Sequence, residues 1–229
     1  MWQFALDLLF PVLCQDCGRE GRYLCLECAA NLPADEPRCI ACGKPSLLGR
    51  IHDDCRTREW ALTGVLVAAS YDAEVVRDLI WQMKYNSVAS IADHLAELLV
   101  DHLVKNDLVD YFSAATVIAV PLHKTRRRER GFNQAELLAT KFAARLGLQH
   151  YPEALKKINN TKPQAKLKRE ERMKNVEGLF AGEAIPSLEQ RKIILIDDVT
   201  TTGATLNECA KVLKTQNPSE IWGLVVARN

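Results

Sequence analysis

The sequence predicts an α/β fold with a parallel sheet, preceded by a small cysteine-rich module. After Trp60, predicted strands alternate with predicted helices, and the strands are continuous runs of Ile, Val and Leu. Such runs are typical of parallel strands that are covered by helices on both faces. Before residue 60, apolar runs of strand length are scarce, and seven of the eight cysteines lie within 14–55. We therefore expect a metal-binding module at 1–60 and an α/β domain at 61–229.

Hydrophobic periodicity places the elements of the α/β domain. Residues 74–85 carry apolar side chains at helical spacing, and Gly147 ends the helix predicted over 133–147. The predicted order is a strand at 64–72, helices at 74–85 and about 88–105, a strand at 115–122, the helix at 133–147, a strand at 192–198, a helix at 204–215 and a strand at 220–227. The basic stretch from 148 to about 178 is expected to be irregular.

Overall composition says little about partners. The net charge is +1, so overall electrostatics favour neither nucleic acid nor an acidic partner. No run reaches the roughly 18 apolar residues that a membrane span needs, and we expect no membrane insertion. Residues 1–14 are apolar but lack a basic start and a cleavage site, so we interpret them as a short helix rather than a secretory signal. Clustered cysteines beside an enzyme-like domain favour metal binding in a reducing cytoplasm over disulfides.

Three C-x-x-C pairs and one H-x-x-C pair follow one another at regular intervals. A C-x-x-C turn brings two thiolates to one metal ion, and two such turns complete a tetrahedral zinc site. Taken in order, the pairs predict a first site of Cys14, Cys17, Cys25 and Cys28 and a second site of Cys39, Cys42, His52 and Cys55. Redox-active cysteines are the alternative, and Asp53 or Asp54 could replace His52. Four protein ligands leave zinc no open position, so both sites would be structural.

A second candidate site follows the predicted strand at 192–198, in the stretch "IILIDDVTTTGATL" (193–206). Two carboxylates, Asp197 and Asp198, end the strand. The loop after them offers backbone N–H groups, hydroxyls and a helix N-terminus to an anion. We call it the Thr/Gly loop; it comprises Thr201, Thr202, Gly203, Ala204 and Thr205. It lacks the lysine of a Walker loop, which disfavours ATP hydrolysis.

A phosphate in this loop beside two carboxylates suits a sugar phosphate. The aspartates would bind ribose hydroxyls, directly or through Mg2+. The alternative is an ordinary strand–loop–helix connection with an exposed acidic end.

Basic side chains gather beyond the strand at 115–122. If that strand adjoins the aspartate strand, residues 121–124 form a short loop that faces the bound ligand, with the following arginines at the rim. The basic residues here are Lys124, Arg126, Arg127, Arg128 and Arg130, and those of 156–174 are Lys156, Lys157, Lys162, Lys166, Lys168, Arg169, Arg172 and Lys174. They bind pyrophosphate or nucleic acid in one interpretation and form a solvated basic helix and loop in the other.

Residues 193–205 resemble the 5-phosphoribosyl-1-pyrophosphate (PRPP) motif of type I phosphoribosyltransferases: an apolar strand, two acids and a T-x-G-x-T loop. Thr200 stands where that pattern usually has a larger apolar residue. Together with the C-x-x-C pairs, "LIWQMKY" (79–85), "RGFNQ" (130–134) and a T-x-x-Q…R-x-x-N element (Thr161, Gln164, Arg172, Asn175), the motif resembles the ComF family from end to end. The resemblance implies a double zinc ribbon before a type I phosphoribosyltransferase domain. It also implies a role in natural competence or in the use of DNA as a nutrient.

The first functional hypothesis is an enzyme. PRPP would bind with Mg2+, its 5-phosphate at the Thr/Gly loop, its ribose near Asp197 and Asp198, and its pyrophosphate beside 122–124. An acceptor would displace pyrophosphate from C1 of the ribose, with mainly electrostatic support from the protein. No general base is assigned. The acceptor would be held by a hood at about 60–90, which carries no recognisable base-binding signature.

Two other hypotheses stay open. In one, the same site senses PRPP or a nucleotide without catalysis, while the zinc module and the basic stretch bind single-stranded DNA or a DNA-uptake helicase. In the other, the chain is a zinc-stabilised scaffold with no small ligand, which the complete Thr/Gly loop disfavours. Cys209, on the following helix, is expected to be a buried small hydrophobe. The oligomeric state is not indicated.

Overall fold

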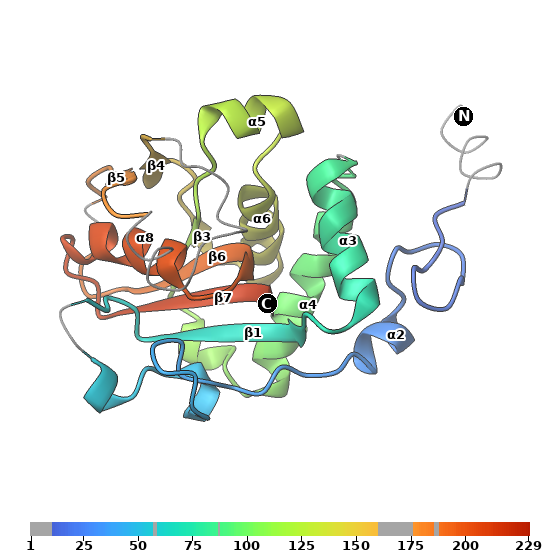
Figure 1. Ribbon diagram of the computed structural model, residues 1–229, viewed down its shortest axis with the longest axis horizontal. Coiled ribbons are helices and arrows are strands. Elements are labelled where there is room, and N and C mark those ends of the chain that lie inside the picture. Colours follow the sequence, from blue (N-terminus) through green and yellow to red (C-terminus); the bar gives the residue numbers. More distant parts are fainter. Residues whose placement is uncertain (1–10, 57–58, 87, 160–175, 186–187) are drawn as a thin grey trace.

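The computed structural model describes residues 11–56, 59–86, 88–159, 176–185 and 188–229 (Figure 1). The helix predicted within 1–14 falls largely outside these residues. So do the following positions singled out in the sequence: Thr161, Lys162, Gln164, Lys166, Lys168, Arg169, Arg172, Lys174 and Asn175. Among the residues that are described, no helix is both long enough and apolar enough to cross a membrane.

A five-stranded parallel sheet forms the centre of the molecule, as predicted. Its strand order is β1 (Gly64–Ser70), β7 (Glu220–Arg228), β6 (Lys192–Thr200), β2 (Thr116–Ala119) and β3 (Gln149–His150). Every neighbouring pair in this sheet is parallel. β6 and β7 are buried along most of their length, which explains their long apolar runs. β2 pairs with β6, so the strand before the basic run does adjoin the aspartate strand.

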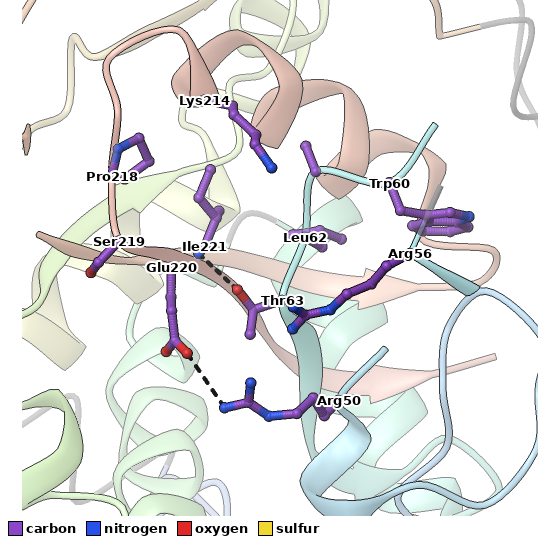
Figure 2. Close-up of a pocket in the computed structure, with 11 residues that line it drawn as sticks. Arg50, Arg56, Trp60, Leu62, Thr63, Lys214, Pro218, Ser219, Glu220 and Ile221 are labelled. Carbon is purple, nitrogen blue, oxygen red and sulfur yellow. Dashed lines mark hydrogen bonds and ion pairs between the residues drawn. The ribbon is translucent and has the colours of Figure 1, made fainter. Parts of the chain in front are cut away.

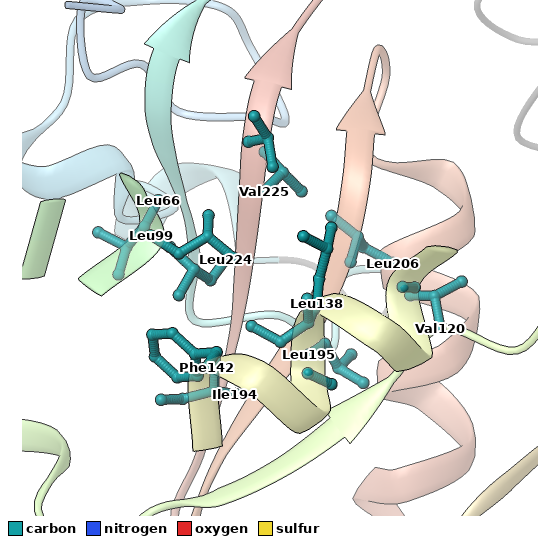
Figure 3. Packing of buried hydrophobic residues seen from close by; sticks show 14 of the residues in the cluster. Leu66, Leu99, Val120, Leu138, Phe142, Ile194, Leu195, Leu206, Leu224 and Val225 are labelled. Atoms are coloured by element: carbon teal, nitrogen blue, oxygen red, sulfur yellow. The ribbon is translucent and has the colours of Figure 1, made fainter. Parts of the chain in front are cut away.

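Helices cover both faces of the sheet. α4 (Ile91–Lys105) and α6 (Gln134–Leu146) pack together on one face, and α8 (Ala204–Lys214) packs on the other. Figure 3 shows Phe142 of α6 and Leu206 of α8 among the buried side chains of the strands. The Asn133 side chain caps the start of α6, and Gly147, with a φ of 65°, ends the helix where the sequence predicted.

A helix and a short turn also belong to this domain. α3 (Glu74–Tyr85) has the predicted bounds and buries its four predicted apolar residues, Val75, Leu79, Ile80 and Met83. The short turn η3 (Asp110–Phe112) leads from α4 into β2. The α/β pattern of the sequence is therefore confirmed.

Two local predictions were wrong. The stretch after 148 contains β3 and an antiparallel pair, β4 (Leu155–Lys157) and β5 (Phe180–Gly182). These strands are two or three residues long, too short for the alternation that identifies a strand in a sequence.

The loop expected at 121–124 covers only 121–123, because Lys124 begins a helix, α5 (Lys124–Arg130). Lys, Arg and Glu favour a helix, and the His123 side chain caps its first turn.

The cysteine-rich module contacts the α/β domain through both of its parts. Its first part, with α2 (Leu26–Ala30), touches α4, where Arg22 pairs with Glu97. Its second part holds the short turns η1 (Leu47–Gly49) and η2 (Asp53–Cys55) and lies along β1. Gly49 comes so close to this strand that a Cβ there would lie 2.1 Å from the Val65 carbonyl oxygen. The domain boundary near residue 60 stays a prediction.

Candidate functional site

The first cysteine cluster has the geometry of a zinc centre. The four sulfurs of Cys14, Cys17, Cys25 and Cys28 all lie within 4.8 Å of one another, and two of them, Cys17 Sγ and Cys25 Sγ, are 3.7 Å apart. A tetrahedral zinc with bonds of about 2.3 Å holds two sulfurs about 3.8 Å apart. Backbone N–H groups of Cys25 and Cys28 also point at the sulfurs of Cys14 and Cys25, at 3.4 Å. These residues fit zinc.

In the second cluster, His52 rather than Asp53 or Asp54 lies beside the three cysteines. The ligand atoms of Cys39, Cys42, His52 and Cys55 lie within 4.8 Å of one another, and Cys42 Sγ is 3.5 Å from His52 Nδ1. The other ring nitrogen, Nε2, is 3.1 Å from the Pro45 carbonyl oxygen. Because a carbonyl can only accept, Nε2 carries the proton and Nδ1 presents its lone pair to the metal. This is the usual outer support of a zinc-bound histidine.

At the carboxyl end of β6, the two aspartates point to opposite faces of the sheet, because side chains alternate along a strand. Asp198 faces α3, where Lys84 Nζ lies 2.9 Å from its Oδ1. Asp197 faces the side of α8 and β4, where its charge acts on Cys209 and Lys157. The Asp198 backbone N–H donates to Asp197 Oδ1 at 2.9 Å. The two carboxylates therefore have separate surroundings.

Burial sets the electrostatics of this strand end. It raises the pKa of Asp197 to about 7, and the neighbouring Asp198 charge adds to the rise. Burial alone would lower the pKa of Lys84, but the Asp198 carboxylate beside it holds that pKa above its usual value. Burial, helped by Arg126, lowers the pKa of Lys157. Two lysines thus lie by the aspartates, one on each face of the sheet.

The Thr/Gly loop turns directly into α8. Gly203, with a φ of 75°, is in the left-handed region and precedes the helix, so Ala204 and Thr205 already belong to its first turn. Thr202 is buried, and its Oγ1 accepts from the Ala204 N–H at 3.4 Å. Thr201 and Thr205 remain partly exposed. The loop therefore presents a helix N-terminus and two hydroxyls toward the outside.

The second zinc cluster packs against the Thr/Gly loop. A Cβ on Gly203 would lie 2.5 Å from Ile40 Cγ1 and 3.5 Å from the Trp60 ring. Ile40 lies between the ligands Cys39 and Cys42 and is itself buried. One turn further along α8, the fully buried Asn207 accepts from the Ala61 N–H at 2.9 Å and donates to the Glu59 carbonyl. Ile40 and residues 59–61 thus brace both the loop and its helix.

The predicted basic residues are only partly brought together. Arg130 lies over the Tyr85 ring at 5.4 Å and donates to Gln134 Oε1 at 3.1 Å, so it lies beside the Lys84–Asp198 pair. Arg126 faces Lys157 on the other side. Lys124 lies further out, where it lines an open hollow of about 420 Å³ with Arg127 and Arg128.

The sequence did not point to Lys84 as a site residue, and it placed Lys157 only among the basic residues of 156–174 that bind pyrophosphate or nucleic acid in one interpretation. Lys84 is in the "LIWQMKY" segment, which was noted for its resemblance alone. Its only signal was a lysine in the last turn of an otherwise amphipathic helix. Cys209, predicted to be a buried hydrophobe, is fully buried.

Two protein-family models match this chain, one in the cysteine-rich module and one in the α/β domain. Residues 5–56 match the double zinc ribbon domain, and residues 129–229 match the phosphoribosyl transferase domain. Competence protein ComFC of Bacillus subtilis is 31% identical over 231 residues, covering 92% of this chain and 85% of that protein. The chain belongs to the ComF family. Its cysteine-rich module is a double zinc ribbon, and zinc is its metal.

Other members of the ComF family align over similar lengths. Competence protein F of Haemophilus influenzae is 29% identical, covering 89% of this chain and 90% of that protein. DNA utilization protein YhgH of Escherichia coli K12 is 28% identical, covering 95% and 98%. Among solved structures, the purine phosphoribosyltransferase from Pyrococcus horikoshii aligns with a TM-score of 0.37 and 13% identity, over 59% of this chain and 83% of that one.

Proposed function

We propose that this ComF protein binds PRPP with Mg2+ at the end of β6 and transfers its phosphoribosyl group with release of pyrophosphate. The observation that carries the proposal is the arrangement around Asp198. This buried carboxylate stands at the carboxyl end of a parallel strand, beside Lys84 and just before a left-handed glycine and a helix N-terminus. Open α/β sheets bind their ligands at such strand ends.

Each part of PRPP has a matching group in this proposal. The 5-phosphate lies against the Thr/Gly loop, and the ribose hydroxyls and Mg2+ lie by Asp197 and Asp198. The pyrophosphate lies by 121–123 and the basic side chains of Arg126 and Arg130. Fixed cations there stabilise the negative charge that grows on the departing pyrophosphate.

Lys84 has to share or give up Asp198 when Mg2+ enters. Mg2+ binding is therefore an exchange of one cation for another at a carboxylate that is already partnered. We therefore expect Mg2+ to bind together with PRPP rather than by itself.

A second function has an observation of its own. Lys124, Arg127 and Arg128 are exposed on α5 and line an open hollow. Two relatives are named for competence and one for DNA utilization. A non-catalytic sensor of PRPP that presents this basic helix to single-stranded DNA or a DNA-uptake helicase is the alternative proposal.

Calorimetric titration of the zinc-loaded protein with PRPP, with and without Mg2+, tests the site. We expect Mg2+-dependent binding that Asp198→Asn weakens by at least about tenfold, because a charge-assisted contact is lost. Asp78→Asn, at an exposed position of α3, is the control and should bind normally. Absence of binding by the wild type would overturn both proposals. Binding without pyrophosphate release, across a panel of heterocyclic acceptors, would favour the sensor.

A further inference from the structure

A separate pocket lies at the opposite end of the sheet from the Thr/Gly loop. Its volume is about 310 Å³, and it is formed by residues just before β1, residues at the start of β7 and the last turn of α8 (Figure 2). Because all strands of this sheet are parallel, the starts of β1 and β7 lie at the edge away from the end of β6. The pocket is therefore distinct from the proposed PRPP site.

One of the three cations around this pocket is already neutralised. Arg50 pairs with Glu220 at 3.4 Å and lies over the Trp222 ring at 5.1 Å. Glu220 also accepts from the Tyr111 hydroxyl and the Trp222 indole N–H. These contacts fix Arg50 as part of the wall.

The other two cations have little compensation. The nearest carboxylate to Arg56 belongs to Asp53, at 3.9 Å, and that carboxylate is 98% exposed. Within the described part of the chain, Lys214 has no ion pair. The negative end of the α8 dipole explains a lysine in its last turn, but it does not explain Arg56, which comes from another segment. Figure 2 shows both side chains extending toward the space around Leu62 and Thr63.

The lining of the pocket suits a small phosphorylated ligand. Leu62 and Ile221 provide an apolar floor, while Thr63 and Ser219 contribute hydroxyls. Pockets of roughly 300 Å³ are at the small end of ligand sites, which commonly lie where two structural units meet. An arginine and a lysine that line one pocket can both bind a phosphate, and the carboxylate in the lining, Glu220, is already held by Arg50, Tyr111 and Trp222.

We propose that this pocket is a second ligand site, in which Arg56 and Lys214 hold the phosphate of a small organic phosphate or of inorganic pyrophosphate. Trp60 lines the same pocket. Its ring also lies close to Gly203 of the Thr/Gly loop, so Trp60 responds to a ligand in either site, and variants of Lys214 and Asp198 assign the response.

The test uses the full, zinc-loaded protein labelled with 5-fluorotryptophan, with the Trp60 fluorine signal assigned through Trp60→Phe. AMP and inorganic pyrophosphate are titrated separately, without Mg2+. We expect the Trp60 signal to shift with at least one probe and Lys214→Glu to weaken that binding by about fivefold or more, because an attraction becomes a repulsion. Lys105→Glu is the matched control, since Lys105 is also an exposed lysine in the last turn of a helix.

Two further variants separate this site from the proposed PRPP site. Asp198→Asn should leave the titration unchanged, and Arg56→Gln should weaken it, with zinc content measured to show that the neighbouring centre is intact. A response to AMP alone indicates an organic phosphate, and a response to pyrophosphate alone indicates the inorganic ion. A shift that survives Lys214→Glu, that is lost in Asp198→Asn, or that neither probe produces at millimolar concentration would overturn the proposal.

Discussion

At the scale of single residues, the pair of Lys84 and Asp198 dominates the candidate site. Their side chains are only 20% and 10% exposed, so each charge depends on the other for compensation. A surface pair of the same geometry would contribute little. Mutation of either residue should therefore change the stability of the protein measurably.

Replacement of Lys84 by Met should destabilise the protein by about 2–3 kcal/mol, because it leaves the Asp198 carboxylate buried without a partner. Denaturant unfolding measures the change. Lys105→Met, at an exposed position, should have little effect. In the double variant with Asp198→Asn, part of the stability should return, since the orphaned charge is gone. Additive losses would show that the two residues are not coupled.

The contact of Gly203 with Ile40 is a second feature at this scale. Ala at Gly203 would have to adopt a left-handed φ and would also strike Ile40, whereas Ala at Gly147 would meet only the strain of φ. We expect a cost of about 1 kcal/mol for Gly147→Ala and clearly more, about 2–3 kcal/mol, for Gly203→Ala. Thermal unfolding compares them. Ile40→Ala in the Gly203→Ala background should recover part of the difference, and equal costs for both alanines would contradict the contact.

At the scale of elements, the second zinc turn acts as a brace for the Thr/Gly loop. The turn from Cys39 to Cys42 carries Ile40 onto Gly203, while the first centre lies near α3 and α4 instead. The two centres should therefore differ in what they support, although both stabilise the module.

A matched pair of cysteine variants tests this difference. Cys17 and Cys42 are both exposed zinc ligands of a C-x-x-C turn. Serine at either position should remove one zinc, as measured by metal content. Only Cys42→Ser should speed hydrogen exchange of the amides at 200–206 and weaken Mg2+–PRPP binding, because only that turn contacts the loop. Equal effects of the two variants would mean that zinc loss acts on the whole fold.

At the scale of the whole molecule, the partly buried Asp197 links stability to pH. Its pKa is raised from the usual 3.8 to about 7, so between these values the folded state holds a proton that the unfolded state has released. This group therefore makes the protein less stable as pH rises from about 4 to about 7. At higher pH, the lost unfolding free energy is what it takes to keep this carboxylate ionised, which is the form that binds a cation.

The difference in unfolding free energy between Asp197→Asn and the wild type isolates this contribution. We expect the variant to gain stability relative to the wild type as pH increases from about 5 to about 8, because its amide has no proton to lose. Mg2+ together with PRPP should reduce the gain above pH 7, since it binds the ionised wild-type carboxylate. A difference that is constant with pH would show that Asp197 titrates in its ordinary range.

Much of the fold and of the site could be predicted from local patterns. The bounds of α3 followed from its apolar spacing, and the end of α6 followed from Gly147. β3, β4 and β5 escaped prediction because two or three residues carry no periodicity and pair only when tertiary contacts hold them. The start of α5 was missed because a run of charges has no apolar face to mark a helix.

The sequence by itself determined the features that are local in the chain: the α/β alternation, the C-x-x-C pairs and the strand–loop–helix of the candidate PRPP site. Each of these depends on residues a few positions apart, whose geometry a turn or a strand end sets. Only the tertiary structure decided that Lys84 pairs with Asp198, that His52 rather than an aspartate faces the second metal, and that Ile40 supports Gly203. The pocket at Arg56 and Lys214 belongs with them, because such contacts join segments that only the packing of the whole chain brings within reach.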